Sequence, residues 1–103
     1  MKIKIIMTTT DSNVIAEKIS NELLEKNLSP CVQIINNVLS TYKWTNKVVK
    51  ETEFLLLIKT TESKINKCKK SIEKMHNYET PELVCLNSNI INDKYKKWFL
   101  DNI

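Results

Sequence analysis

The chain has no glycine, so none of its turns can use the residue that most readily adopts positive φ. Asparagine and aspartate are the other residues that tolerate the left-handed region. We therefore expect asparagine to build any turn that needs positive φ. The candidates are Asn36, Asn37, Asn46, Asn77, Asn87, Asn89 and Asn92.

Paired cysteines and long apolar runs are also missing. The three cysteines, Cys31, Cys68 and Cys85, form no CxxC pair, and their odd number argues against a disulfide framework. This indicates a reducing compartment, the cytoplasm. No apolar run is long enough for a signal peptide or a membrane span, so we expect no membrane association. At 103 residues, the chain is predicted to be one domain over residues 1–103.

The charged residues do not form a stripe of one sign. The formal net charge is +4, but the lysines are spread along the chain with acidic residues between them. We therefore expect no nucleic-acid binding. The chain also lacks a glycine-rich phosphate loop and a nucleophile-elbow motif, and its one histidine has no identifiable orienting partner. These absences indicate a protein that is not an enzyme.

The hydrophobic periodicity predicts an α+β fold. Strands are expected over residues 2–9, 31–44, 47–60 and 82–87, and helices over 12–27, 62–76 and 92–101. Asp11 is the expected cap of the first helix, Thr45–Asn46 the expected hairpin turn, and Asn36–Asn37 a candidate bulge or bend. The order βαββαβ is that of a ferredoxin-like sandwich, here followed by a C-terminal helix.

The strand over residues 47–60 is apolar on both faces. Phe54, Leu56 and Ile58 share one face, whereas Leu55 and Leu57 lie on the other. Two helices cover only one face of a ferredoxin-like sheet, so the second face needs another cover. The sequence therefore predicts an oligomer.

Cys68 falls at helical spacing among apolar residues and is expected to fill the core.

Residues 76–82 bring the only histidine, two carboxylates and a proline into one connection between a helix and a strand. One interpretation is a ligand or metal site near a subunit boundary. The other is a helix C-terminus that His76 stabilises through the helix dipole. On local chemistry alone the second is favoured, because no other histidine lies at ligand spacing.

Five segments together resemble the CutA family of divalent-cation tolerance proteins. They are Cys31-Val32-Gln33-Ile34, Ser40-Thr41-Tyr42-Lys43-Trp44, Glu53 through Lys59-Thr60, His76-x-Tyr78-Glu79-x-Pro81-Glu82, and Tyr95-x-x-Trp98. The resemblance implies a ferredoxin-like subunit in a tight homotrimer, similar in architecture to the PII signalling proteins. The family usually has glycine where Asn46 stands and proline where Asn77 stands.

The resemblance implies two groups of site residues. Cys31, with a thiolate suited to Cu(I), His76 and Glu82 are the candidate ligands of copper or another divalent cation. Tyr42, Trp44 and Tyr78 are expected in an inter-subunit cleft, the first two as interface packing. Glu53 and Lys59 are also expected there, but they lie about 20 Å apart along one strand, so each needs a different partner.

The resemblance implies a non-enzymatic homotrimer that binds or responds to divalent metal ions such as copper. The alternative is a PII-like trimer that binds a small organic molecule in the cleft near His76 and Glu82 and acts as a signalling or scaffold protein. No other protein partner can be named from the sequence.

Overall fold

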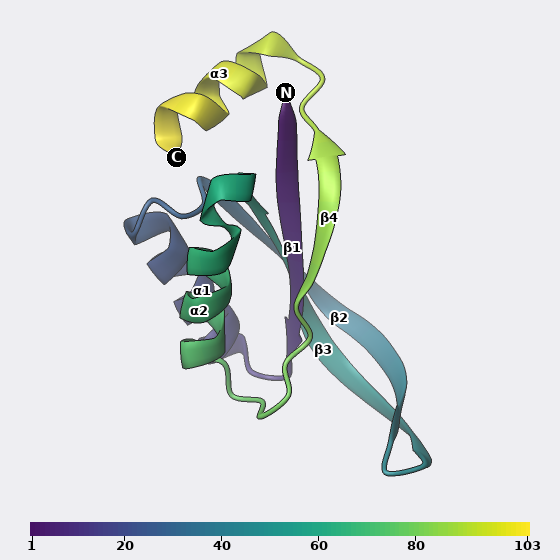
Figure 1. The fold of residues 1–103 in the computed structure, drawn as a ribbon. Coiled ribbons are helices and arrows are strands. Elements are labelled where there is room, and N and C mark those ends of the chain that lie inside the picture. The colour runs from purple at the N-terminus through teal and green to yellow at the C-terminus, as the bar shows by residue number, and fades with distance from the viewer.

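The computed structural model describes residues 1–103 as one four-stranded antiparallel sheet with three α-helices (Figure 1). The strands lie in the order β2-β3-β1-β4. The elements are β1 (Lys2–Thr10), α1 (Asn13–Glu25), β2 (Cys31–Trp44), β3 (Lys47–Thr60), a 3-10 turn η1 (Glu62–Lys64), α2 (Ile65–Met75), β4 (Val84–Asn89) and α3 (Asp93–Asn102). The predicted ferredoxin-like order with a C-terminal helix is confirmed.

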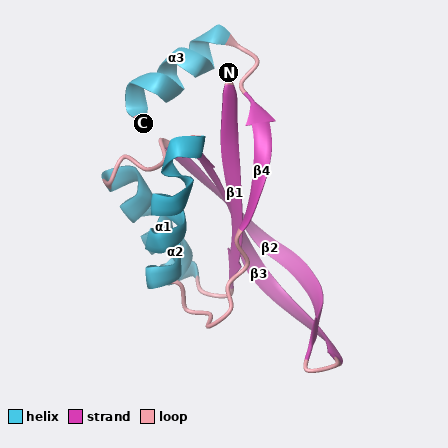
Figure 2. Ribbon diagram, viewed as in Figure 1, coloured by secondary structure: helices cyan, strands magenta, loops and turns pink.

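Helices α1 and α2 pack on one face of the sheet and form the main core with it (Figure 2). Burial of their apolar stripes provides most of the stabilisation expected of such amphipathic helices. Cys68 is fully buried there, and its thiol lies 3.6 Å from the Leu28 carbonyl oxygen. It therefore fills the core, as its spacing predicts. The buried side chains are Ile6, Ala16, Ile19, Leu23, Leu28, Leu56, Ile58, Cys68, Ile72 and Met75.

The cap of α1 differs from the prediction. Ser12, not Asp11, has the extended backbone of an N-cap, and its Oγ accepts the amide of Ile15 at 3.2 Å. Asp11 instead accepts a hydrogen bond from the Asn77 side chain at 2.8 Å. The helix begins at Asn13 and ends at Glu25, so the expected range of 12–27 was too long at both ends.

Asparagine builds three of the four positive-φ positions, as the absence of glycine predicts. Asn37 has φ 59° at the point where the register of β2 against β3 shifts, so the expected bulge is present. Asn46 has φ 62° in the hairpin turn, and Asn27, which was not among the candidates, has φ 55° after α1. Thr45 is the exception at φ 48°. A β-branched residue is uncommon in this region, so the turn carries backbone strain.

The connection between α2 and β4 also shifts the predicted boundaries. The expected helix over 62–76 begins with the 3-10 turn, and His76 is already extended (φ −66°, ψ 143°). The expected strand over 82–87 forms two residues later, from Val84 to Asn89. Pro81 cannot donate a ladder hydrogen bond, which is consistent with a later start.

The sheet face opposite α1 and α2 is only partly covered. Phe99 of α3 packs with Ile3 and Ile90 at one end of the sheet. Strand alternation places Leu57 and its partner Met7 on this face, beyond that contact. We call this surface the open face; its apolar side chains include Ile5, Met7, Ile35, Leu55, Leu57, Val84 and Leu86. Beyond it, the ends of β2 and β3 project from the body as a two-stranded hairpin (Figure 1).

Candidate functional site

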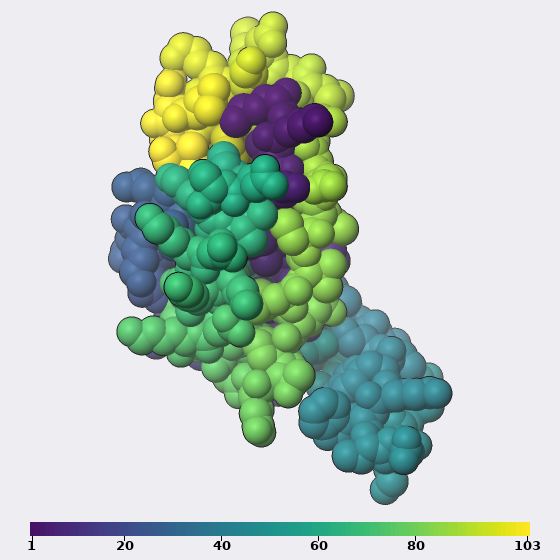
Figure 3. All heavy atoms as spheres, viewed as in Figure 1, coloured from purple at the N-terminus to yellow at the C-terminus, as the bar shows by residue number.

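A cavity of about 900 Å³ lies between the projecting hairpin and the connection that precedes β4. Figure 3 shows a notch between the hairpin and the rest of the molecule. β2 and β3 continue beyond Thr10, where β1 ends, so the projecting hairpin and the end of β1 both border the cavity. The lining residues are Thr9, Asp11, Ser40, Thr41, Tyr42, Lys43, Trp44, Val49, Glu51, Glu53, Asn77, Tyr78, Glu79, Thr80, Pro81 and Glu82.

The structure brings five of the eight predicted site residues into this cavity: Tyr42, Trp44, Glu53, Tyr78 and Glu82. They come from β2, β3 and the connection after α2, so only the fold makes them neighbours.

His76 lies beside the cavity, with its ring centroid 5.0 Å from that of Tyr78. The remaining two predicted residues, Cys31 and Lys59, are cross-strand partners on β2 and β3. The Lys59 ammonium donates to the Tyr95 hydroxyl at 3.2 Å and lies 5.2 Å from the centre of that ring. Lys59 is six residues from Glu53, or about 20 Å along β3. Cys31 and Lys59 therefore lie away from the cavity.

Glu53 is the most buried carboxylate of the cavity, with 5% of its surface exposed. The Tyr78 hydroxyl donates to its Oε2 at 2.6 Å, which is a short, charge-assisted hydrogen bond. Burial, together with this bond and the Glu53 charge, raises the pKa of Tyr78. The phenol is thus held protonated as the donor. The partner that the sequence required for Glu53 from another element is Tyr78 of the same chain.

Both ring nitrogens of His76 are engaged. Nε2 lies 2.9 Å from the Thr9 carbonyl oxygen, and Nδ1 accepts the amide of Tyr78 at 3.0 Å. Burial lowers the pKa of His76, opposed by the hydrogen bond to Thr9 and by the charges of Glu53 and Asp11. The imidazole is therefore neutral at physiological pH and fastens the end of α2 to β1.

The cavity is strongly acidic in a chain whose formal net charge is +4. One lysine, Lys43, lies among five carboxylates. We call the cavity the acidic pocket; its carboxylates belong to Asp11, Glu51, Glu53, Glu79 and Glu82. Burial and hydrogen bonding to Glu51 raise the pKa of Tyr42 at its wall. A wall of this charge attracts cations and repels anions.

Three of these carboxylates, those of Asp11, Glu51 and Glu79, were not predicted as site residues. Glu51 has the same strand parity as Glu53, which was a usable signal. Asp11 was assigned to helix capping, and Glu79 was part of the singled-out turn but given no role of its own. Their convergence depends on how the projecting hairpin, the end of β1 and the connection after α2 are arranged in the fold, which no local pattern reveals.

The donor chemistry of the acidic pocket suits a divalent cation. Carboxylate oxygens are ligands for hard and borderline divalent ions. Within one chain, however, no three His, Cys, Asp or Glu side chains converge closely enough to hold a metal ion. Cys31, His76 and Glu82 do not meet at one point. One chain thus supplies carboxylates for a cation but not a closed coordination shell.

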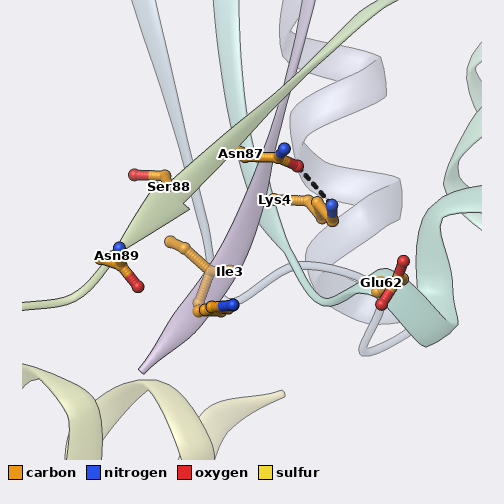
Figure 4. Close-up of a pocket in the computed structure, with 7 residues that line it drawn as sticks. Ile3, Lys4, Glu62, Asn87, Ser88 and Asn89 are labelled. Carbon is orange, nitrogen blue, oxygen red and sulfur yellow. Dashed lines mark hydrogen bonds between the residues drawn. The ribbon is translucent and has the colours of Figure 1, made fainter.

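A second cavity, of about 350 Å³, opens at the other end of the sheet, near the N-terminus. Figure 4 shows the Lys4 ammonium hydrogen bonded to the Asn87 side chain, with Glu62 nearby. None of the predicted site residues lines it. We therefore place the candidate site at the acidic pocket.

No helix of the chain is both long and apolar enough to span a bilayer.

Comparisons with known proteins agree on one family. The model of the family described as "CutA1 divalent ion tolerance protein" matches residues 4–102. The chain is 34% identical over 99 residues to the divalent-cation tolerance protein CutA of Thermus thermophilus, covering 96% of each chain. It is also 34% identical over 93 residues to a CutA homolog of Xenopus laevis, covering 90% of this chain and 62% of that protein.

Solved structures show the same likeness. The Thermus thermophilus protein superposes with a TM-score of 0.90 at 34% identity, covering 99% of this chain and 98% of that one. CutA1 of Ehrlichia chaffeensis gives a TM-score of 0.88 at 33% identity, covering 96% and 92%. With the family match across almost the whole sequence, these findings show that the chain belongs to the CutA1 divalent ion tolerance protein family.

Proposed function

We propose that this chain is a non-enzymatic homotrimer that binds or responds to divalent metal ions such as copper. The observation that carries the proposal is the acidic pocket, where five carboxylates gather in a chain of net positive charge. The family match to divalent ion tolerance proteins supplies the class of ligand. The pocket attracts cations electrostatically, and its oxygen atoms suit divalent ones.

The open face supports self-association. Ile35, Val84 and Leu86 keep 46%, 47% and 44% of their surface exposed. A contiguous apolar surface of this kind marks a contact area. The projecting hairpin also leaves Leu39, Trp44 and Val48 exposed, at 65%, 57% and 67%. We propose that neighbouring subunits cover both surfaces, so that the acidic pocket lies in an inter-subunit cleft and a second chain contributes to its walls.

Within this proposal the carboxylates of Glu51 and Glu82, which line the acidic pocket, are the candidate cation ligands. Glu53 is already bound to Tyr78. Cys31, on the other hand, is a half-buried free thiol away from the pocket. Its thiolate would suit Cu(I) and not a cation bound by the pocket carboxylates. The three free cysteines support a reducing, cytoplasmic setting.

The charge of the pocket argues against the alternative of a PII-like protein that binds an anionic small molecule. Phosphate-bearing or carboxylate ligands would meet five carboxylates and one ammonium group. Like charges at such a site cost binding free energy. No observation favours a PII-like organic ligand.

The proposal is tested by calorimetric titration with Cu²⁺. The background is Cys31→Ser with Cys85→Ser, so that the two accessible thiols neither bind nor reduce the metal. Glu51→Gln and Glu82→Gln in this background should weaken binding by about tenfold or more, because each removes a charged oxygen donor. The matched control is Glu17→Gln, an exposed carboxylate on α1, which should have no effect.

Two results would contradict the proposal. One is a copper affinity that the double serine background alone abolishes, which would assign the metal to the thiols. The other is an equal, small effect of all three glutamine variants, which would indicate diffuse surface binding. Sedimentation velocity on the same samples tests the homotrimer, and a monomeric mass would refute that part.

A further inference from the structure

The hydrogen bonds of His76 determine which of its nitrogens carries the proton. A carbonyl oxygen only accepts, so Nε2, at 2.9 Å from Thr9 O, must be the donor. The amide of Tyr78 only donates, so Nδ1, at 3.0 Å, must be the acceptor. One neutral tautomer satisfies both contacts, and it leaves no lone pair free on the ring. The partner at Nε2 is a carbonyl of Thr9, a residue with 9% of its surface exposed.

His76 is linked through Tyr78 to the base of the acidic pocket. Its Nδ1 holds the Tyr78 amide, and the Tyr78 hydroxyl donates to Glu53 at 2.6 Å. The tilted contact between the two rings adds a second restraint on Tyr78. These contacts run from the end of β1 through the connection after α2 to the middle of β3. They determine where the buried carboxylate points.

Asn77 fastens the same connection from its other side. Its Oδ1 accepts the Thr10 hydroxyl at 2.6 Å, and its Nδ2 donates to Asp11 at 2.8 Å. Asn77 thus restrains the turn by two side-chain hydrogen bonds. The connection therefore has two hydrogen-bonded side chains next to each other.

We infer that His76 is a positioning residue and not a metal ligand: it fastens the connection after α2 to β1 and so holds the Tyr78 hydroxyl on Glu53. The role of His76 in the turn does not depend on the proposed function. The second part of the inference, that carboxylates and not the imidazole contact the cation, rests on the proposed function. Metal coordination by His76 would displace either the Tyr78 amide from Nδ1 or the proton that Nε2 donates to Thr9.

The first test is a long-range ¹H–¹⁵N spectrum of the imidazole at about pH 7.5, above the usual histidine pKa. His76 is the only histidine, so its signals need no assignment. We expect the Nε2–H tautomer, and we expect its ¹⁵N shifts to stay unchanged when Zn²⁺ is added to saturation. The Nδ1–H tautomer, or a large shift of either nitrogen with Zn²⁺, would overturn the inference.

The second test follows the Tyr78 hydroxyl in protein labelled with ¹³C at the tyrosine Cζ. There are three tyrosines, and the Tyr78→Phe variant identifies the signal. His76→Leu should shift this signal toward that of a solvent-exposed tyrosine. His76→Gln, which retains one donor and one acceptor, should restore much of the wild-type position.

The matched control is Met75→Ala, which removes a neighbouring core side chain of 8% exposure without touching these hydrogen bonds. It should destabilise the protein and leave the Tyr78 signal in place. If Met75→Ala moves the signal as His76→Leu does, the effect is general loosening and the positioning role is refuted. If His76→Leu does not fold, the His76→Gln variant and the tautomer measurement still test whether His76 positions Tyr78.

The claim that His76 is not a metal ligand is tested separately, by the melting temperature with and without Zn²⁺. Zn²⁺ should raise the melting temperature of both wild type and His76→Gln by a similar amount. Loss of this shift in His76→Gln alone would overturn the inference. If Zn²⁺ stabilises neither protein, the cation part of the inference fails; the tautomer and Tyr78 results still test the positioning role, and the Cu²⁺ titration still tests the proposed function.

Discussion

The hydrogen bond between Tyr78 and Glu53 should be among the most costly single polar contacts to remove. Tyr78→Phe deletes only the hydroxyl that lies 2.6 Å from the carboxylate. Glu53 is 5% exposed, so little water can replace the lost donor. Hydrogen bonds to charged groups contribute about 1.5–3 kcal/mol, and the unsatisfied buried acceptor makes the higher part of that range relevant. We expect a loss of about 2 kcal/mol in the free energy of unfolding.

The assay is urea denaturation at one fixed protein concentration, because assembly would make stability depend on concentration. The double-mutant cycle adds Glu53→Gln and the combined variant. In the Glu53→Gln background, Tyr78→Phe should cost only about 1 kcal/mol, since the remaining bond is neutral. The melting temperature of the single variant should fall by about 10 °C for a chain of this size.

The control is Tyr95→Phe. Its hydroxyl accepts from the Lys59 ammonium at 3.2 Å, and this half-buried ammonium can turn to water when the partner is lost. We expect a cost below about 1 kcal/mol. If Tyr78→Phe and Tyr95→Phe cost the same, or if the cycle shows no coupling between Tyr78 and Glu53, the interpretation of Glu53 as a buried, tyrosine-bound carboxylate is wrong.

Three further predictions address other parts of the molecule. Leu57→Glu would place an unpaired charge on the open face and should dissociate or misfold the oligomer; a stable oligomer by sedimentation would refute the assignment of that face. Ser12→Ala removes the side-chain cap of α1 and should cost about 1 kcal/mol by urea denaturation, whereas Asp11→Ala should not affect that cap. Burial lowers the pKa of His76, so as the pH falls the unfolded chain binds this proton at a higher pH than the folded chain does. The associated stability is complete above the unfolded pKa of about 6.5 and is lost as pH falls below it. The wild-type melting temperature should therefore fall more steeply below this pH than that of His76→Gln, and parallel profiles would contradict the prediction.

The fold was predictable because its signals are local. Strand alternation, helical spacing and turn asparagines each depend on a few neighbouring residues, and the order of elements followed from them. The errors in the cap of α1 and in the start of β4 arose where neighbouring residues compete for the same structural role. Ser12 caps α1 in place of Asp11, which the Asn77 side chain engages, and the α2–β4 connection delays the start of β4 to Val84.

The candidate site was predictable only in part. The family resemblance and the polar turn indicated Tyr78 and Glu82, which do line the acidic pocket. They gave no indication that Cys31 lies at the start of β2, at the end away from the projecting hairpin. Nor did they indicate that both ring nitrogens of His76 are already hydrogen bonded. Such facts depend on the arrangement of the hairpin, β1 and the connection after α2, and on hydrogen bonds between distant segments. A sequence shows which groups are available but not which ones already have partners.

Cation binding by the pocket carboxylates can be seen directly in an anomalous difference map, recorded at the zinc absorption edge from crystals grown with Zn²⁺. We expect a peak in the acidic pocket about 2.0–2.2 Å from oxygen atoms of Glu51 or Glu82, and no peak on the His76 ring. Glu82→Gln should weaken this peak. A peak on His76, or metal found at Cys31 with none in the acidic pocket, would contradict this expectation.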